Sequence, residues 1–204
     1  MTEIAAHHEA PAESSWMAMY PREAWQKAAF RFPILLWRMG LGPLLGRIFM
    51  LITHTGRTSG LPRRTVVEYH RLEDGRKVIP CAFGERAQWY RNIAADPRVT
   101  IQTADGVERV SARRLRGDDE LLAAYNVLMR RNALMMRPYL ESLGINPADP
   151  IELLEKRDRV YLLTFDPTDE PTPPPVEADL TGAWAVIGAA LALILLPGLL
   201  RRRR

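Results

Sequence analysis

Side chains able to hold an anion are concentrated in one stretch, residues 51–65, which reads LITHTGRTSGLPRRT. Guanidinium groups, hydroxyls and backbone N–H groups beside glycine are donors that proteins use for phosphate groups. A hairpin whose arginines face solvent is the alternative that this spacing allows. The stretch is not a P-loop, because the Lys-Ser/Thr pair is missing and no helical pattern follows. The candidate anion ligands are Arg57, Thr58, Ser59, Gly60, Arg63, Arg64 and Thr65.

A second cluster begins where an apolar run ends, with CAFG at residues 81–84 and WYRN at residues 89–92. A turn at Asp96-Pro97 and an extended segment from Val99 follow. Taken in order with THTGRTSGLPR at residues 53–63, these motifs resemble the deazaflavin-dependent nitroreductase family. Members of that family use coenzyme F420, an 8-hydroxy-5-deazaflavin, on a split β-barrel. The resemblance runs over about residues 33–165.

This resemblance implies how a cofactor would be held. Its phosphate and polyglutamate tail would meet the basic stretch, while the strand end and the aromatic cluster would flank its ring system. Trp89 as a plain core residue is an equally good interpretation. Hydride transfer depends on position more than on a titrating group, so no catalytic acid or base is assigned. The additional residues assigned to the cofactor, F420 or alternatively FMN, are Ala82, Phe83, Gly84, Arg86, Trp89, Tyr90 and Asn92.

Departures from the family pattern bear on the substrate. The loop at residues 84–88 is shorter than in the best-known members and lacks their lysine, for which Arg86 is the expected substitute. Glu68 stands where relatives often have an aromatic residue, so reduction of nitro compounds is not implied. The helical segment 125–139 covers the region that forms the substrate pocket in relatives, although a Met-rich helix is more often simply core. Glu68, Tyr125, Met136 and Tyr139 are the candidate pocket residues.

The expected activity is hydride transfer between reduced deazaflavin and an apolar acceptor such as a quinone or an unsaturated lipid. An FMN-using barrel is the alternative among enzymes, and a flavin- or lipid-binding protein without turnover is the alternative from another class. Barrels of this type often pair, so the resemblance also implies a homodimer.

Composition excludes several other classes. A single cysteine, Cys81, rules out an intrachain disulfide and indicates a reducing compartment, and the four histidines show no metal-binding motif. The net charge of +4 is that of the four arginines at residues 201–204. Because the remaining arginines form no stripe with interleaved aromatic residues, nucleic-acid binding is not expected.

The C-terminal region predicts a membrane anchor. Residues 181–200 carry no charge, are about long enough to span a bilayer as a helix, and have Trp184 near one end and the basic tail 201–204 at the other. A buried core helix is the alternative. Residues 166–180 are rich in proline and acidic side chains and are expected to form a semi-rigid linker. The positive-inside rule would place the head outside, but the polar N-terminus lacks a secretory signal, so a cytoplasmic head on a single-pass anchor is expected.

A second hydrophobic stretch, residues 30–52, is interrupted by Arg31, Arg38 and Arg47. This pattern suits an interfacial segment at a membrane or a helix that covers one mouth of a barrel. Both interpretations stay open at this point.

The remaining pattern predicts a mainly β (α+β) protein: a split antiparallel β-barrel with flanking helices and a C-terminal transmembrane helix. Residues 1–23 are expected to be disordered and residues 24–165 to form the barrel domain. Helices are expected at 24–38, 89–95 and from Gly117 onward. The six predicted strands are 47–54, 64–72, 77–82, 99–103, 108–115 and 159–165.

Overall fold

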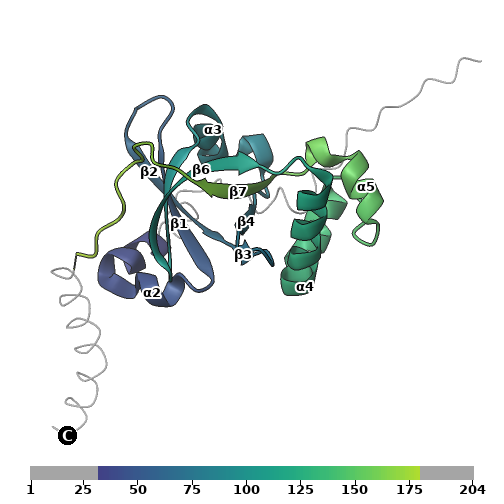
Figure 1. Ribbon diagram of the computed structural model, residues 1–204, viewed down its shortest axis with the longest axis horizontal. Coiled ribbons are helices and arrows are strands. Elements are labelled where there is room, and N and C mark those ends of the chain that lie inside the picture. The colour runs from purple at the N-terminus through teal and green to yellow at the C-terminus, as the bar shows by residue number, and fades with distance from the viewer. Residues whose placement is uncertain (1–31, 180–204) are drawn as a thin grey trace, which may run out of the picture.

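The computed structural model describes residues 32–179, which form one curved antiparallel sheet with helices around it (Figure 1). The strands are β1 (Phe49–Thr55), β2 (Pro62–Glu68), β3 (His70–Arg71), β4 (Lys77–Pro80), β5 (Arg98–Thr103), β6 (Gly106–Arg114) and β7 (Leu162–Pro167). The helices are η2 (Trp37–Leu41), α2 (Gly42–Leu45), η3 (Gly84–Arg86), α3 (Gln88–Ala95), α4 (Asp118–Ser142), α5 (Pro150–Glu155) and η4 (Arg157–Arg159).

The strand order, β2-β1-β5-β6-β7-β4-β3, explains why the sheet curves. Its two edge strands, β2 and β3, are consecutive in the chain and separated only by Tyr69. The Tyr69 hydroxyl donates to the Gly46 carbonyl at 2.9 Å, and its backbone N–H donates to the Ile48 carbonyl at 3.2 Å. One stretch therefore supplies both edges, as a barrel requires. The prediction of one continuous strand over 64–72 is wrong. The strand breaks at Tyr69 into β2 and β3, so the sheet has seven strands instead of the six predicted.

Side chains alternate between two hydrophobic clusters because successive residues of a strand face opposite sides. On β4, Ile79 lies in the interior of the curved sheet with Met50 and Ile101, whereas Val78 packs outside it in the cluster that contains α4. Leu163 and Leu162 divide in the same way on β7. Each fully buried aliphatic side chain contributes roughly 1.5–3 kcal/mol relative to exposure. The outer cluster therefore fixes α4 to the sheet.

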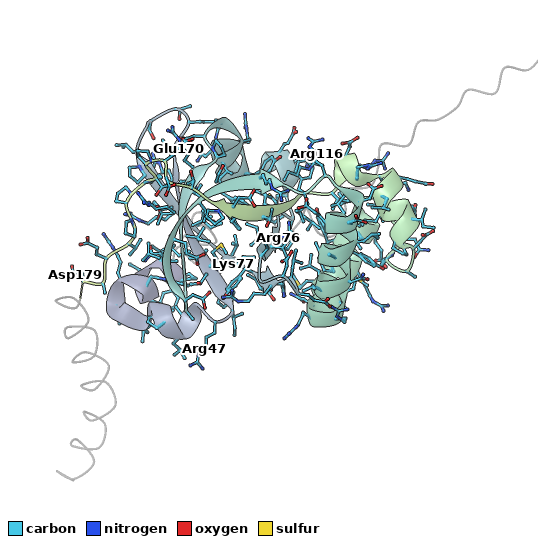
Figure 2. The ribbon with its side chains drawn as sticks, viewed as in Figure 1. Arg47, Arg76, Lys77, Arg116, Glu170 and Asp179 are labelled. Atoms are coloured by element: carbon cyan, nitrogen blue, oxygen red, sulfur yellow. The ribbon has the colours of Figure 1, made fainter. Side chains whose placement is uncertain are left out.

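The acidic, proline-rich segment after β7 is not a free spacer. The Gln102 side chain exchanges two hydrogen bonds with the backbone of Val176, accepting from its N–H at 2.7 Å and donating to its carbonyl at 3.0 Å. Val176 is buried against Trp37 and Leu51. Figure 2 shows this segment running past Glu170 to Asp179 at the end of the molecule that carries α2. The linker prediction is therefore wrong for residues 168–179, because this apolar anchor and its backbone bonds offset the ordering cost.

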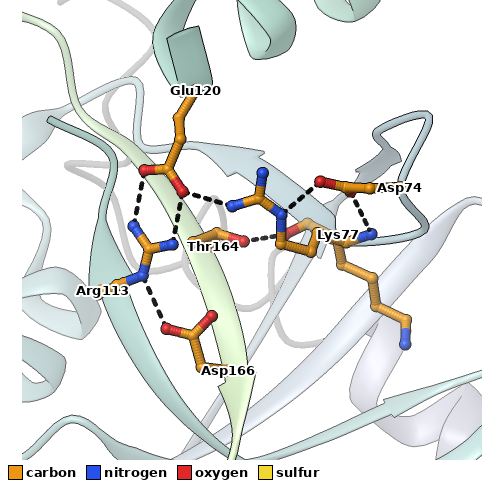
Figure 3. Close-up of polar contacts among 7 residues, drawn as sticks. Asp74, Lys77, Arg113, Glu120, Thr164 and Asp166 are labelled. Carbon is orange, nitrogen blue, oxygen red and sulfur yellow. Dashed lines mark hydrogen bonds and ion pairs between the residues drawn. The ribbon is translucent and has the colours of Figure 1, made fainter. Parts of the chain in front are cut away.

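α4 follows Gly117, as predicted, and its 25 residues extend beyond the expected 125–139. A network of charges holds its first turn on the sheet (Figure 3). Two Arg113 nitrogens donate to the two Glu120 oxygens at 2.7 and 2.8 Å, Arg76 contacts the same carboxylate, and Arg113 Nε donates to Asp166 at 2.7 Å. These contacts hold the pKa of Glu120 at about 2, chiefly through Arg113. The helix then kinks at Asn132, where φ is −145° and ψ is 50°.

The helix expected at 24–38 is described only from residue 32, and its backbone continues into the π-helical turn η2. Within residues 32–179, no helix combines the length and apolar character needed to cross a bilayer. The segments predicted to be a disordered N-terminus, 1–23, a transmembrane helix, 181–200, and a basic tail, 201–204, lie outside the described residues.

Candidate functional site

A cavity of about 670 Å³ lies between β2, the start of α3 and the second half of α4. The loop between β1 and β2 forms one end of it, and the segment after β4 contributes a side. This volume is typical of small-molecule and cofactor sites. The predicted residues that line it are Arg57, Thr58, Ser59, Arg63, Arg64, Thr65, Glu68, Ala82, Phe83, Trp89, Asn92, Met136 and Tyr139.

Two predicted glycines shape the surroundings and do not line the cavity. Gly60 adopts a φ of 65° in the β1–β2 loop, a conformation that L-residues rarely adopt. Gly84 has a φ of 49°, and a Cβ at this position would lie 3.0 Å from the ring of Tyr161. Both glycines are therefore needed for backbone geometry, which accounts for the motif without a direct role in binding.

Three further predicted residues lie elsewhere. Tyr90 packs edge-on against Tyr161, with ring centroids 5.2 Å apart, because it occupies the face of α3 that meets the sheet interior. Arg86 is exposed in η3. Tyr125 is buried, and its hydroxyl donates to the Pro147 carbonyl at 2.6 Å. The structure therefore does not bring these three residues to the cavity.

The β1–β2 loop is closed by its own backbone. Gly56 N–H donates to the Leu61 carbonyl at 2.9 Å, and Gly60 N–H donates to the Gly56 carbonyl at 2.8 Å. Ser59 Oγ accepts from Leu61 N–H at 3.3 Å and from Arg63 at 3.4 Å. A Cβ on Gly56 would lie 2.7 Å from Ser59 Oγ, so the loop leaves no room for a side chain there. This compact loop presents its arginines at a fixed place.

Arg57 is held by the amide side chains of α3. Its Nη1 donates to Asn92 Oδ1 at 2.9 Å and its Nη2 donates to Gln88 Oε1 at 2.9 Å. The backbone N–H of Arg57 also reaches Asn92 Oδ1, at 3.3 Å. Neutral amides orient a guanidinium without cancelling its charge. Arg57 therefore keeps a full positive charge at the end of the cavity.

The buried His54 continues this chain of contacts. Its Nδ1 lies 3.3 Å from the Asn92 amide nitrogen, and the ring is 2% exposed. Burial lowers the pKa of His54 to about 4, with a smaller contribution from Arg63 in the same direction and an opposing one from the Thr55 backbone. The imidazole is thus uncharged at neutral pH. Since the Asn92 amide nitrogen can only donate, Nδ1 accepts and the ring proton lies on Nε2. His54 lines the cavity, a place that motif spacing did not indicate.

A second polar cluster crosses the cavity between β2 and α4. Asn132 Nδ2 donates to both Glu68 oxygens, at 3.0 and 2.9 Å, and His70 Nε2 lies 3.3 Å from Glu68 Oε1. Burial lowers the pKa of His70, against the opposing effect of Glu68. The residue at which α4 kinks, Asn132, is therefore also the residue that is hydrogen-bonded to Glu68 on β2.

The other lining residues were missed at the level of sequence. On α4, positions 128, 132, 135, 136 and 139 follow the spacing of one helical face, which was a usable signal. The residues not predicted are His54, Gly56, Val66, Val67, His70, Pro80, Ala87, Gln88, Leu128, Asn132 and Met135. Residues 32–179 contain no cluster of three or more histidine, cysteine or carboxylate side chains arranged to hold a metal.

Comparison with known proteins bears on this site. The model of the F420H(2)-dependent quinone reductase family matches residues 40–140, which include the β1–β2 loop, α3 and most of α4. No curated protein matches the chain.

Solved structures with a similar course of the chain include an F420-H2 dependent reductase, FDR-A, at 24% identity. The match covers 58% of this chain and 93% of that one, with a TM-score of 0.42. A heme-binding protein from Mycobacterium smegmatis is 17% identical over 64% of this chain and 50% of its own, with a TM-score of 0.41. A structure described as a domain-swapped dimer is 19% identical over 70% of this chain and 97% of its own, with a TM-score of 0.38.

The resemblance inferred from the motifs is thus confirmed at the level of F420-dependent reductases, and the narrower nitroreductase description is not. All the residues that line the cavity fall within the matched stretch, including the basic loop, Phe83 and Trp89. The family match shows that the chain is an F420-dependent oxidoreductase.

Proposed function

We propose that this protein transfers a hydride from reduced F420 to an apolar acceptor such as a quinone or an unsaturated lipid. The observation that carries the proposal is the division of one cavity into a cationic end and an apolar end. Arg57, Arg63 and Arg64 form the first, on the β1–β2 loop and the start of β2, and Leu128, Met135 and Met136 form the second, on α4. An anionic cofactor at the cationic end and a hydrophobic substrate at the apolar end together match the two ends of this cavity.

The cationic end fits the anionic tail of the cofactor. Arg57 is oriented by neutral partners, Arg63 by the Ser59 hydroxyl, and Thr58 adds a hydroxyl on the same loop. Hydrogen bonds between guanidinium and phosphate or carboxylate are among the stronger ones in proteins. Three arginines among the residues that line one cavity suit a ligand with several negative charges.

The walls near the middle of the cavity suit a flat ring system. Phe83, Ala82 and Trp89 line this part, and Ala87 leaves space at the start of α3. When bound, reduced deazaflavin supplies the hydride. The side chains of this protein would position the ring and the acceptor and keep water away, which is the main requirement of hydride transfer.

The acceptor side is defined by α4. Leu128, Met135 and Met136 present aliphatic and thioether groups, which adapt to apolar ligands of different shape. Glu68 and Asn132 add a polar pair on this wall. An acceptor with polar oxygens on an apolar ring, such as a quinone, combines both properties.

The direct test is to mix purified protein with reduced F420 and a short-chain quinone and to follow cofactor oxidation by absorbance. We expect repeated turnover that saturates with quinone, and tighter binding of F420 than of FMN or riboflavin. Binding of F420 without oxidation by any quinone or unsaturated lipid would indicate a binding protein. Preferential binding of FMN would refute the cofactor assignment.

Two neighbouring residues of α4 provide a matched pair for the acceptor. Met135 lines the cavity, whereas Leu134 is 85% exposed and lies outside the lining. Met135→Glu should raise the KM for quinone several-fold and leave F420 affinity unchanged, because a carboxylate in an apolar wall is poorly solvated. Leu134→Glu should change neither quantity. Equal effects of the two variants would remove α4 from the acceptor site.

A further inference from the structure

Large apolar side chains are exposed together on the segment that precedes β1. Phe32, Leu35, Leu41, Leu44 and Ile48 each expose between 40% and 65% of their surface. We refer to these five residues as the N-terminal patch. Single exposed apolar residues are common on proteins, but five of them within residues 32–48 indicate a surface that meets another apolar phase.

The opposite face of the same segment is firmly packed. Trp37 is 4% exposed and lies against Leu51 and Val176, with Ile34 and Leu45 partly buried beside it. The segment is therefore amphipathic, and its orientation on the sheet is fixed. The exposed side chains of the N-terminal patch are not the result of a loosely packed helix.

The charged side chains within residues 32–48 are both arginines. Arg38 and Arg47 are exposed within this segment, and residues 32–67 contain no aspartate or glutamate. Figure 2 shows Arg47 projecting from the outer side of the segment beside α2. Apolar side chains flanked by arginines are the features that hold a surface helix at the headgroup boundary of an anionic bilayer.

The described chain ends beside this patch. The Asp179 backbone N–H donates to the Arg38 carbonyl at 2.7 Å, so the segment after β7 leads directly to the N-terminal patch. The next stretch of sequence, residues 181–200, contains no charged side chain and is the predicted membrane anchor. Because residues 168–179 are docked on the sheet, no free spacer separates this anchor from the head.

We propose that the N-terminal patch is a docking surface for a lipid bilayer, with its apolar side chains in the headgroup boundary and Arg38 and Arg47 against anionic headgroups. The bilayer is favoured over a second copy of this chain because the described chain ends beside the patch, at Asp179, immediately before the uncharged stretch 181–200. The head is then held on the membrane by two elements, the patch and the segment that follows Asp179. This inference does not depend on the identity of the acceptor.

The test uses the full-length chain in vesicles of phosphatidylcholine and phosphatidylglycerol. An environment-sensitive fluorophore is attached at Leu44→Cys or, as a matched control, at Ile151→Cys, since the two residues are 65% and 66% exposed. Cys81 should not react because it is buried, and burial raises the pKa of its thiol to about 12. The parent protein serves as the labelling control.

We expect the Leu44 probe to be quenched by doxyl-labelled lipid and protected from aqueous iodide, with the reverse at Ile151. A Leu44 probe as accessible to iodide as the Ile151 probe would overturn the proposal. Protection from both quenchers would also overturn it, because another part of the chain or a second copy would then cover the patch. A second experiment places the fluorophore at Leu41→Cys and adds one further substitution. Ile48→Glu should abolish quenching of this probe by doxyl-labelled lipid, and the control Ile151→Glu should leave the quenching unchanged.

Discussion

Two groups of arginines in this molecule have opposite surroundings. Arg57 and Arg63, at the cavity, are held by amide and hydroxyl oxygens that carry no charge. Arg76 and Arg113, at the start of α4, share the carboxylate of Glu120 (Figure 3). The charge of an arginine is therefore a poor guide to its role until the charge of its partner is known.

The physical difference lies in how much of the positive charge of the arginine remains after it has bonded to each kind of partner. A carboxylate satisfies the guanidinium N–H groups and cancels the charge, so Arg76 and Arg113 fasten α4 to the sheet. An amide satisfies the N–H groups and leaves the charge, so Arg57 attracts an anion while its position is already set. The first group is expected to affect stability, and the second to affect cofactor affinity.

The largest expected effect is on binding. Arg57→Ala should weaken F420 affinity by about 1.5–3 kcal/mol, the range for hydrogen bonds to charged groups. It should leave the thermal midpoint nearly unchanged, because Arg57 is exposed on a loop. The measurement is fluorescence titration of F420, with Arg91→Ala as the control, since Arg91 is exposed on α3 outside the cavity lining. Equal losses in both variants would mean that general charge, and not position, governs binding.

Acid titration should distinguish the contribution of His54, at the cavity, from that of Glu120, in the ionic network. The pKa of His54, about 4, lies below the 6.5 of an unfolded imidazole, so stability present above pH 6.5 is lost as pH falls to 4. The pKa of Glu120, about 2, lies below its ordinary 4.5, so its contribution is lost between pH 4.5 and 2. His54→Gln should reduce the loss of stability between pH 6.5 and 4 by roughly 2 kcal/mol, measured by urea unfolding. Part of that loss should remain, because burial also lowers the pKa of His70. If His54→Gln and a Glu120→Gln variant altered stability over the same pH range, the assignment of these two pH windows would fail.

The ionic network predicts a smaller and purely structural effect. Glu120→Gln should lower the free energy of unfolding by about 1–2 kcal/mol, a discounted value because the side chains are 25–40% exposed to solvent. F420 affinity should not change. Chemical denaturation and F420 titration of the same sample check both statements, and Glu155→Gln, at an exposed position of α5, is the control.

Salt should produce the smallest effect. Raising ionic strength from about 0.05 to 0.5 M shortens the Debye length to less than about 5 Å, which screens attraction between the cavity arginines and an anionic tail. F420 affinity should fall several-fold, and riboflavin, which lacks the charged tail, should show no such change. A salt-independent F420 affinity would indicate that the tail does not contact these arginines.

The β-strands were predictable because their signal is local. Alternation of apolar residues located β1, β5 and β6 to within about three residues. The break at Tyr69 was not, since it depends on contacts with Gly46 and Ile48, far along the chain. The docking of Val176 on Gln102 likewise depends on a partner 74 residues away.

The residues of the site likewise fall into those that the sequence indicated and those whose contacts depend on the tertiary fold. The basic loop was predicted from residue type and spacing and the strand end from the family resemblance, and the structure brings both to one cavity. The contact of Arg57 with Asn92, 35 residues apart, and the bond of Asn132 to Glu68, 64 residues apart, follow only from the tertiary fold. Tyr90 and Tyr125 do not reach the cavity, because the sequence alone did not show which face of each helix is buried against the rest of the fold.

Both edges of the sheet belong to one stretch of the chain, β2 and β3 on either side of Tyr69. Unpaired edge strands are where β-proteins recruit strands from other molecules and begin to aggregate. Within residues 32–179 that hazard is confined to about ten residues, and most of β2 lines the cavity. A ligand that fills the cavity would shield the same edge, so occupancy of the site and resistance to aggregation are coupled through a single strand.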